Sequence, residues 1–327
     1  MMSKRAEFSL VGVMALLASA AVPVGAQEHE RSFDWTPLRA PQHLAQAQPS
    51  SPALEPDSQQ ELQIEASEGK AAALAKEAQN PIANLTSLPI QWNATPGTQW
   101  APTSVDPSAS HNQTLHVVNV QPVVPFKVSK DLTIVSRTIA PFVSQPWSSG
   151  SALNGLGDIN PSLFFVPTLK GDVTVGVGPT MILPTATDRE RSSKRWSAGP
   201  TGVLVVTKGP WVLGGLANNV WSFAGEKGQP VSQMLIQPFL NYNLPKGWYL
   251  TSSPIITANW NNPTGRGWTV PIGAGVGRVF KLGQQPINAS LSAYWHAQQA
   301  EIDGEQLLGD VTIRAQVQFL FPKRPRS

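Results

Sequence analysis

Few residues of this sequence have the types and spacing that catalysis needs. Of its five histidines, only His116 and His296 fall in stretches with period-two apolar patterning, near the ends of those stretches. A hydrolase would need a serine held against one imidazole and a third group to orient the ring. Asn112 and Thr114 precede His116, but no serine stands at a spacing that obliges it to meet this ring. We therefore expect His116 to be a polar residue of an interfacial zone, and we predict no catalytic residue and no enzymatic activity.

Metal and cofactor chemistry has equally little support in the sequence. There is no cysteine and no pair of histidines spaced as His-x-x-x-His, so neither a thiolate site nor a helical zinc site is expected. The stretch "GVGPTM" (176–181) carries glycines, but its pattern indicates a strand rather than a phosphate loop that opens a helix. We expect no cofactor, no metal ion and no nucleic-acid partner.

Polar side chains that alternate with apolar ones indicate a different kind of site. In residues 231–244, one row holds Met234 and Ile236, while the opposite row holds Gln233 and Gln237. A polar inner row and an apolar outer row are typical of a transmembrane barrel with a water-filled lumen. The residues that this alternation places in the lumen are Gln121, Arg137, Asp158, Asn160, Gln233, Gln237, Asn241, Asn259, Arg314, Gln316 and Gln318.

Charge in such a lumen would set its selectivity, because rings of arginine or lysine favour anions. Arg137 and Arg314 against Asp158 predict at most a slight preference for anions. An ion pair between Asp158 and either arginine inside the barrel explains the same residues equally well.

The elements that must position these side chains are strands. After Asn80 the sequence keeps a period of two through twelve segments. A tilted transmembrane strand needs roughly 9–11 residues, so the lengths of these segments fit a bilayer. The predicted strands are residues 84–92, 115–126, 132–143, 156–167, 173–184, 196–207, 211–223, 231–244, 248–260, 268–280, 286–297 and 310–321.

The connections between these segments alternate in length. Five are tight turns, such as "KGP" (208–210), whereas the other six are mostly longer and more polar, such as "TATDRERSSKR" (185–195). An up-and-down barrel requires this alternation, with both termini at the tight-turn end. We therefore predict an all-β fold, a transmembrane antiparallel up-and-down β-barrel of about twelve strands, over residues 81–323 in the bacterial outer membrane. Residues 324–327 would form a C-terminal tail.

Tryptophans mark the ends of the predicted strands. An indole ring prefers the headgroup level of a membrane, so barrels carry aromatic girdles at both interfaces. Two polar residues interrupt the apolar row: Arg278, which is close enough to a turn to extend its side chain to water, and Asn219, which indicates a β-bulge or an error in register. The predicted girdle consists of Trp92, Trp196, Trp211, Trp221, Trp248, Trp260, Trp268 and Trp295.

Two segments precede the predicted barrel. Residues 1–26 combine a basic start, an apolar stretch and a Val-Gly-Ala cleavage pattern, as in a secretory signal peptide. Residues 27–80 would be a low-complexity periplasmic segment with a short helix near 65–79. They hold nine acidic and four basic residues, whereas residues 81–327 hold eleven and eighteen. The helix would either plug the periplasmic mouth of this oppositely charged barrel or, slightly favoured, belong to a flexible tail.

Several stretches resemble a known family. They include "GLGDINPSLFF" (155–165), "GVGPTMILPTAT" (176–187), "QPFLNYNLPKGWYLTSSPIITANW" (237–260) and "VQFLFPK" (317–323). Together they resemble a family of bacterial outer-membrane barrel proteins whose members are labelled transporter or neuromedin U, and which are similar to the barrels linked to phenol meta-pathway degradation. The resemblance covers about residues 70–323. It implies the fold and the location, but no settled substrate and no site residues.

The closing strand and the lumen together define the expected function. The stretch "IRAQVQFLF" (313–321) contains Phe319 and ends in Phe321, like the terminal aromatic signal by which outer-membrane barrels are recognised for assembly. The expected partners are outer-membrane lipids, the barrel-assembly machinery through the C-terminal strand, and a small-molecule solute of unknown identity. We expect a narrow channel or transporter for small molecules, aromatic ones among them. The alternatives are a structural or adhesive outer-membrane protein without a transport role and, third, an interfacial hydrolase.

Overall fold

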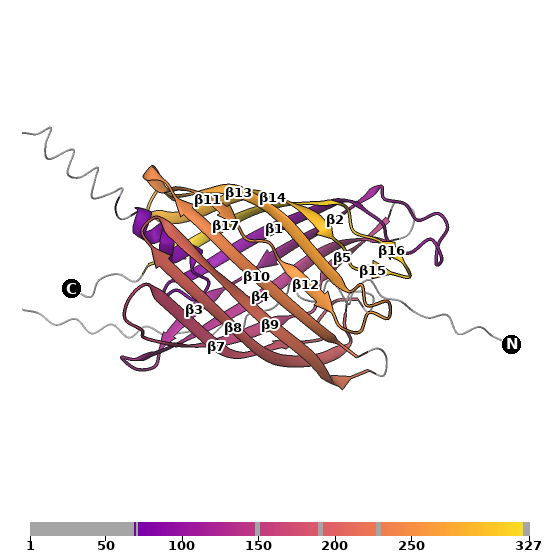
Figure 1. The fold of residues 1–327 in the computed structure, drawn as a ribbon, viewed down its shortest axis with the longest axis horizontal. Helices are drawn as coiled ribbons and strands as arrows, with labels where there is room; N and C mark the ends of the chain where they lie inside the picture. Colours follow the sequence, from indigo (N-terminus) through magenta and orange to yellow (C-terminus); the bar gives the residue numbers. More distant parts are fainter. Residues whose placement is uncertain (1–68, 70, 148–150, 189–191, 227–229, 323–327) are drawn as a thin grey trace, which may run out of the picture.

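The chain folds into a closed barrel of antiparallel strands. The computed structural model describes residue 69 and residues 71–147, 151–188, 192–226 and 230–322. The predicted signal peptide, most of the predicted low-complexity segment and the predicted C-terminal tail lie outside these residues. In Figure 1 the strands wind obliquely around one long axis. The barrel wall consists of β1 (Thr86–Thr98), β2 (Gln113–Val120), β3 (Val123–Lys127), β4 (Leu132–Trp147), β5 (Ser151–Leu156), β6 (Asn160–Pro167), β7 (Val173–Ile182), β8 (Arg195–Lys208), β9 (Trp211–Gly225), β10 (Ser232–Asn243), β11 (Trp248–Ser252), β12 (Ile256–Asn259), β13 (Trp268–Leu282), β14 (Gln285–Gln298) and β17 (Val311–Phe321).

The barrel closes because its first strand pairs with its last. β1 pairs with β17 from Thr86 opposite Phe321 to Ala94 opposite Ile313, and it pairs with β2 on its other edge. The strands then follow one another in antiparallel order around the wall. β2 with β3, β5 with β6, and β11 with β12 each act as one interrupted strand, which gives twelve in total. The predicted fold class, an all-β antiparallel barrel of twelve strands with a short helix before it, is confirmed.

Several predicted boundaries are wrong at the loop end of the barrel. β1 continues to Thr98, well beyond its predicted end. β4 and β5 extend as a hairpin into the predicted loop over 144–155. Two short strands, β15 (Glu301–Ile302) and β16 (Glu305–Gln306), pair within the predicted loop over 298–309. These extensions lack the long apolar row that marked the other strands, so the period-two pattern did not reveal them.

Three predicted strands are interrupted rather than continuous. Pro122 separates β2 from β3 and Pro254 separates β11 from β12, because proline has no N–H group to donate to a neighbouring strand. Gly157 lies between β5 and β6, where a Cβ atom would stand 2.8 Å from Cγ of Pro141. The chain therefore leaves the ladder briefly at these three points.

The interior of the barrel is less polar than predicted. The largest cluster of buried apolar side chains in the described residues lies on the inner face and is built by β3, β4, β6, β8, β9 and β10. Val135 and Phe164, paired across β4 and β6, are fully buried in it. Ile82, from the segment before β1, also packs into this cluster beside Gly176, where the absence of a side chain leaves room for it. The inner face is therefore not polar throughout, because several strands carry apolar side chains on both faces.

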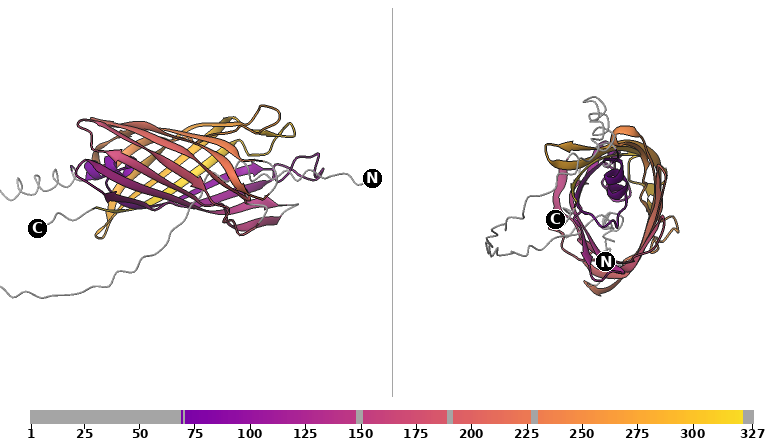
Figure 2. Two further views of the ribbon diagram at one scale, coloured as in Figure 1. Left: turned by 90° about the horizontal axis from the view of Figure 1, so that it is seen from below. Right: turned by 90° about the vertical axis from the view of Figure 1, so that its left-hand side faces the viewer.

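A short helix over residues 71–79 lies inside the mouth at the tight-turn end, as the end-on view of Figure 2 shows. Ala75 is almost fully buried and packs in one cluster with Tyr249 of the barrel. The side-chain amides of Gln79 and Asn243 bond to each other in both directions, at 2.9 and 3.1 Å. The flexible tail that the sequence slightly favoured is therefore wrong for these residues. No helix in the described part of the chain is long and apolar enough to cross a membrane.

The outer face of the barrel is apolar and carries the tryptophans. Seven of the eight predicted girdle tryptophans are exposed on it, and Trp268 is half-buried. Asn219 faces outward in regular pairing with β10, and its Oδ1 accepts a hydrogen bond from Nε1 of Trp260 at 2.7 Å. Neither the bulge nor the register error expected at Asn219 is present. The guanidinium of Arg278 lies 5.1 Å from the ring centre of Trp248, where a cation–π contact directs it toward the turn.

Gly277→Ala should destabilise the barrel because the ring of Tyr249 covers this glycine. A Cβ atom at residue 277 would overlap the ring, standing 2.7 Å from Cε1, and would displace a side chain that also holds the helix. We expect a loss of about 1–3 kcal/mol in the free energy of unfolding, measured by urea titration of tryptophan fluorescence in lipid vesicles. Gly202→Ala is the control, since the nearest atoms lie 3.9 Å from a Cβ there. Equal stability of the two variants would contradict this account.

Candidate functional site

A cavity of about 150 Å³ lies in the lumen next to the helix. Its walls come from strands on opposite sides of the barrel order, β1, β14 and β17 on one side and β9 and β10 on the other. The helix over 71–79 borders the cavity through Glu77 and Gln79. A smaller space of about 20 Å³ shares several of its lining residues and extends to Asn160. The two spaces adjoin each other through these shared residues.

Arg314 organises the polar wall of the cavity. Its Nε donates a hydrogen bond to Oδ1 of Asn93 at 2.9 Å, and one terminal nitrogen donates to the backbone carbonyl of Ser253 at 2.7 Å. The guanidinium lies 4.6 Å from the ring centre of Tyr294, within the range of a cation–π interaction. The charge is thus held in a fixed place by uncharged groups from the two neighbouring strands, β1 and β14, and from the break between β11 and β12.

Arg137 supplies the second positive charge at the cavity. A terminal nitrogen of its side chain donates to Oε1 of Gln121 at 2.9 Å. Gln121 lies at the break between β2 and β3, and its backbone N–H donates to the carbonyl of Pro89 on β1 at 2.8 Å. The interruption of the strand therefore positions the glutamine that orients Arg137.

The opposite wall of the cavity contains an apolar surface. Leu216 of β9 and Phe239 of β10 form it, and Gln237 and Asn241 of β10 lie on the same wall. Both apolar residues belong to the apolar cluster on the inner face. The cavity can therefore offer hydrogen bonds and positive charge to a ligand, and apolar contact at Leu216 and Phe239.

Most of the residues predicted for the lumen border these two spaces, although Asp158, Gln233 and Asn259 do not. Gln233 and Asn259 are paired across β10 and β12, nearer to the loops. Sequence reasoning missed Leu216 and Phe239, yet the period-two row that predicted its glutamine and asparagine neighbours also contains Phe239. The predicted residues that border the large cavity are Gln121, Arg137, Gln237, Asn241, Arg314, Gln316 and Gln318, and Asn160 borders the small one.

Asp158 holds a loop rather than an arginine. It is buried at the break between β5 and β6, and its carboxylate accepts hydrogen bonds from the backbone N–H of Ala186 at 3.2 Å and the hydroxyl of Ser192 at 2.9 Å. The backbone N–H of Ser193 donates to its second oxygen. In the described residues no ion pair joins Asp158 to Arg137 or Arg314. The pairing inside the barrel that the sequence left open is absent from this part of the chain.

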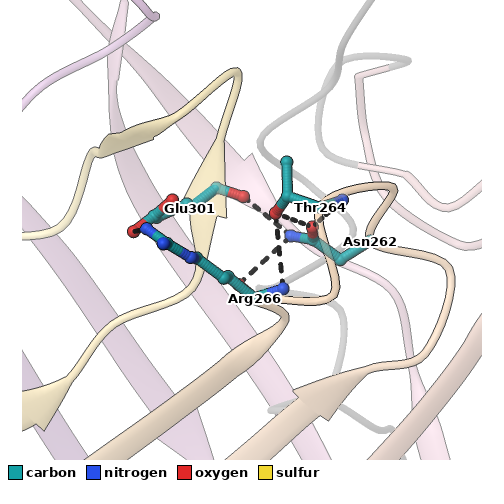
Figure 3. Close-up of polar contacts among 4 residues, drawn as sticks. All are labelled: Asn262, Thr264, Arg266 and Glu301. Carbon is teal, nitrogen blue, oxygen red and sulfur yellow. Dashed lines mark hydrogen bonds and ion pairs between the residues drawn. The ribbon is translucent and has the colours of Figure 1, made fainter.

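The loops at the opposite end of the barrel from the helix are joined by polar contacts (Figure 3). Arg266 forms an ion pair of 2.8 Å with Glu301 of β15, and Nδ2 of Asn262 donates to the carbonyl of Glu301 at 2.7 Å. Since the side chain of Arg266 is 69% exposed, this ion pair contributes about 0–1 kcal/mol. Its effect is to orient the β15–β16 hairpin against the loop after β12.

Glu305 joins the same hairpin to the loop after β1. Its carboxylate accepts hydrogen bonds from the backbone N–H of Thr103 at 3.0 Å, from the hydroxyl of Thr103, and from Nε2 of Gln99 at 3.1 Å. The hydrogen bonds from Thr103 lower the pKa of Glu305 because they favour the ionised carboxylate. The β15–β16 hairpin is therefore fastened to loops from two sides of the barrel.

The histidines do not form a catalytic arrangement with a serine in the described residues. His116 stacks on Trp92, with ring centres 5.8 Å apart. His296 contacts the carbonyl of Gly309 through Nδ1 at 2.7 Å and the hydroxyl of Thr312 through Nε2 at 3.1 Å. Within the described ranges, no group of three or more histidine, aspartate or glutamate residues could hold a metal ion.

Comparisons with known proteins define the class of the fold. No protein-family model and no curated protein matches this chain. The chain is similar to an outer membrane channel from Pseudomonas putida F1, with a TM-score of 0.52 and 12% identity over 72% of this chain and 96% of that chain. It is also similar to the CymD monoaromatic hydrocarbon channel, with a TM-score of 0.43 and 8% identity over 79% of this chain and 92% of that chain. A third similar structure is outer membrane phospholipase A from Escherichia coli, with a TM-score of 0.39 and 15% identity over 78% of this chain and 98% of that chain.

The similarity to the Pseudomonas channel shows a shared fold, that of a bacterial outer-membrane β-barrel. At such low identity it shows nothing further, and the two lower TM-scores carry no argument. The resemblance of the sequence to the barrels labelled transporter or neuromedin U therefore stays a prediction.

Acidification should release the β15–β16 hairpin from the loop after β1. Because the pKa of Glu305 is lowered, the contact adds stability above the ordinary glutamate pKa of about 4.3, and this stability is lost as the pH falls through the lowered value. We expect the protection of the Thr103 amide against hydrogen exchange, corrected for intrinsic rates, to fall below about pH 4. Glu305→Gln should remove this pH dependence. Asp106→Asn is the control, because Asp106 bonds to Ser108 within its own loop; an unchanged pH profile in Glu305→Gln would contradict the assignment.

Proposed function

We propose that this protein is a bacterial outer-membrane channel for small molecules with an apolar body, aromatic molecules among them. The observation that supports this most is the interior, a cavity of about 150 Å³ that combines hydrogen-bonding groups with the apolar side chains of Leu216 and Phe239. A closed barrel with an exposed apolar exterior and tryptophans near its strand ends is typical of a protein that spans a lipid bilayer. The fold that it shares with the Pseudomonas channel adds support.

In this proposal the tight-turn end of the barrel faces the periplasm, because outer-membrane barrels have short turns on that side. The helix over 71–79 then closes the periplasmic mouth, and the tied loops lie at the outer surface. Arg278 and Trp248 would stand at the periplasmic interface, while Asn219 and Trp260 would stand at the outer one.

The helix acts as a plug that a solute must displace. It is held mainly by the small apolar cluster around Ala75 and by the amide pair between Gln79 and Asn243. A neutral hydrogen bond contributes about 0.5–1.5 kcal/mol net, so release of the plug breaks few strong interactions. The channel would therefore be closed at rest and open intermittently.

The alternative functions have less support from the described residues. A structural or adhesive outer-membrane protein has no need of an arginine-bearing cavity beneath a docked helix. An interfacial hydrolase needs a nucleophile beside its imidazole on the lipid side, and there the ring of His116 lies against Trp92.

Ala75→Trp should open the channel by expelling the helix. Ala75 is 1% exposed, so an indole cannot fit in its place without displacing the helix from the mouth. Ala73→Trp is the matched control, because Ala73 lies on the exposed side of the same helix. We expect several-fold higher mean single-channel conductance for Ala75→Trp in planar bilayers, and conductance near that of the native chain for Ala73→Trp. Equal conductance and open probability of the two variants would exclude the plug.

Phe321→Ala should impair assembly more than folding. Phe321 ends the closing strand with its side chain exposed on the outer face, where the assembly machinery could bind it. Phe280→Ala is the control, since Phe280 has a similar exposed ring near the tight-turn end of β13. Both variants should refold to similar extents in detergent, whereas only Phe321→Ala should lower the amount of assembled barrel in cells. A similar loss in both variants would contradict a specific signal.

A further inference from the structure

Within the described residues, two arginines at the cavity have only uncharged hydrogen-bond partners. Arg137 donates to the amide oxygen of Gln121, and Arg314 donates to the amide oxygen of Asn93 and to a backbone carbonyl. Both side chains are half-buried and border the same cavity. Two positive charges therefore face one confined space in which the hydrogen bonds stabilise their position but do not neutralise them.

The carboxylates of the described residues do not supply the missing negative charge. Asp158 bonds to the loop that precedes β8. Glu77 borders the cavity from the helix but forms no ion pair with Arg137 or Arg314 in the described part of the chain. Confining charge away from bulk water is costly without an opposite charge nearby. An anion that enters the cavity would therefore bind favourably.

The rest of the cavity restricts what else such an anion contains. Leu216 of β9 and Phe239 of β10 form an apolar surface across from Arg314. The volume of about 150 Å³ is comparable to that of an engineered apolar cavity, of ~150 Å³, that binds benzene. A highly hydrated anion such as phosphate would keep its water shell and make no direct contact with these apolar side chains. An aromatic ring would contact them directly.

We propose that Arg137 and Arg314 form a binding site in the lumen for the carboxylate group of a small aromatic acid. The inference rests on the proposed channel function and names the class of molecule that the channel takes. The carboxylate accepts hydrogen bonds from the guanidinium nitrogens that face the cavity, and the aromatic ring lies against Leu216 and Phe239. Tyr294, Asn93 and Gln121 act as positioning residues, because they hold the two guanidinium groups in place.

Equilibrium binding to the purified full chain in detergent micelles tests this site without requiring passage through the barrel. The probe is benzoate, and benzyl alcohol is the matched uncharged ligand with the same ring. Titration calorimetry in a buffer of low chloride concentration should show tighter binding of benzoate than of benzyl alcohol. Arg137→Gln and Arg314→Gln should each weaken benzoate binding by about 10- to 100-fold and leave benzyl alcohol nearly unchanged, since each removes a hydrogen bond to a charged group.

Arg278→Gln is the matched control variant, because Arg278 lies on the outer face and should leave benzoate binding unchanged. If Arg314→Gln does not fold, Arg137→Gln and the comparison of the two ligands on the native chain decide the question. The proposal is overturned if benzoate and benzyl alcohol bind equally, or if sodium chloride displaces benzoate at the same concentration as sodium acetate does. If Ala75→Trp conducts ions but the chain does not bind benzoate selectively, the channel function stands and the binding site is overturned. If the chain binds benzoate but Ala75→Trp does not conduct, the binding site stands and the channel function is overturned.

Discussion

The pairing of β1 with β17 is the constraint on which the rest of the structure depends. In lipid, each backbone N–H and C=O group must be hydrogen-bonded within the protein, so a spanning sheet cannot leave a free edge. Closure with twelve strands gives an interior of intermediate width. It is wider than in small barrels, which side chains fill, and narrower than in large barrels, which leave an open channel. The chain reduces this interior further, by turning apolar rows inward and by placing a helix in one mouth. A narrow, shaped cavity is therefore a result of the strand number as much as of any single residue.

The two walls of the lumen explain why strands of one barrel have different patterns. On β1, β14 and β17 the inner rows are polar, and Arg314 of β17 donates hydrogen bonds to Asn93 of β1 and to the carbonyl of Ser253 at the break between β11 and β12. On β8, β9 and β10 valine, leucine and phenylalanine also face inward. The interior consequently combines many polar groups, some of them fixed by hydrogen bonds, with an apolar surface against which part of a small molecule could pack. The three breaks in the strands contribute to this, since one of them places Gln121 beside Arg137.

The sequence predicted the barrel because its signals are local. A period of two, alternating short and long connections and tryptophans near strand ends all follow from the environment on the outer face. The interior depends on contacts between distant strands, so it was predicted only in part. Phe239 and Gln237 share one row, yet the alternation does not show that Phe239 meets Leu216, Val123 and Ile82 in an apolar cluster. The hydrogen-bond partners of Asp158 could likewise not be predicted from the sequence, because the loop that bonds to Asp158 is close in space but about thirty residues away in the chain.

The attachment of the helix to the first strand affects how long the mouth can stay open. Ile82 is anchored in the apolar cluster of the lumen, while the helix ends at residue 79, so only the short link through Asn80 and Pro81 can act as a hinge. Even when released, the helix would stay within a few residues' reach of its own binding surface, at an effective concentration on the order of millimolar or more. Closure would then be an intramolecular event whose rate does not depend on how much protein the membrane contains. A solute would pass during brief openings, and the barrel would reseal itself without any partner.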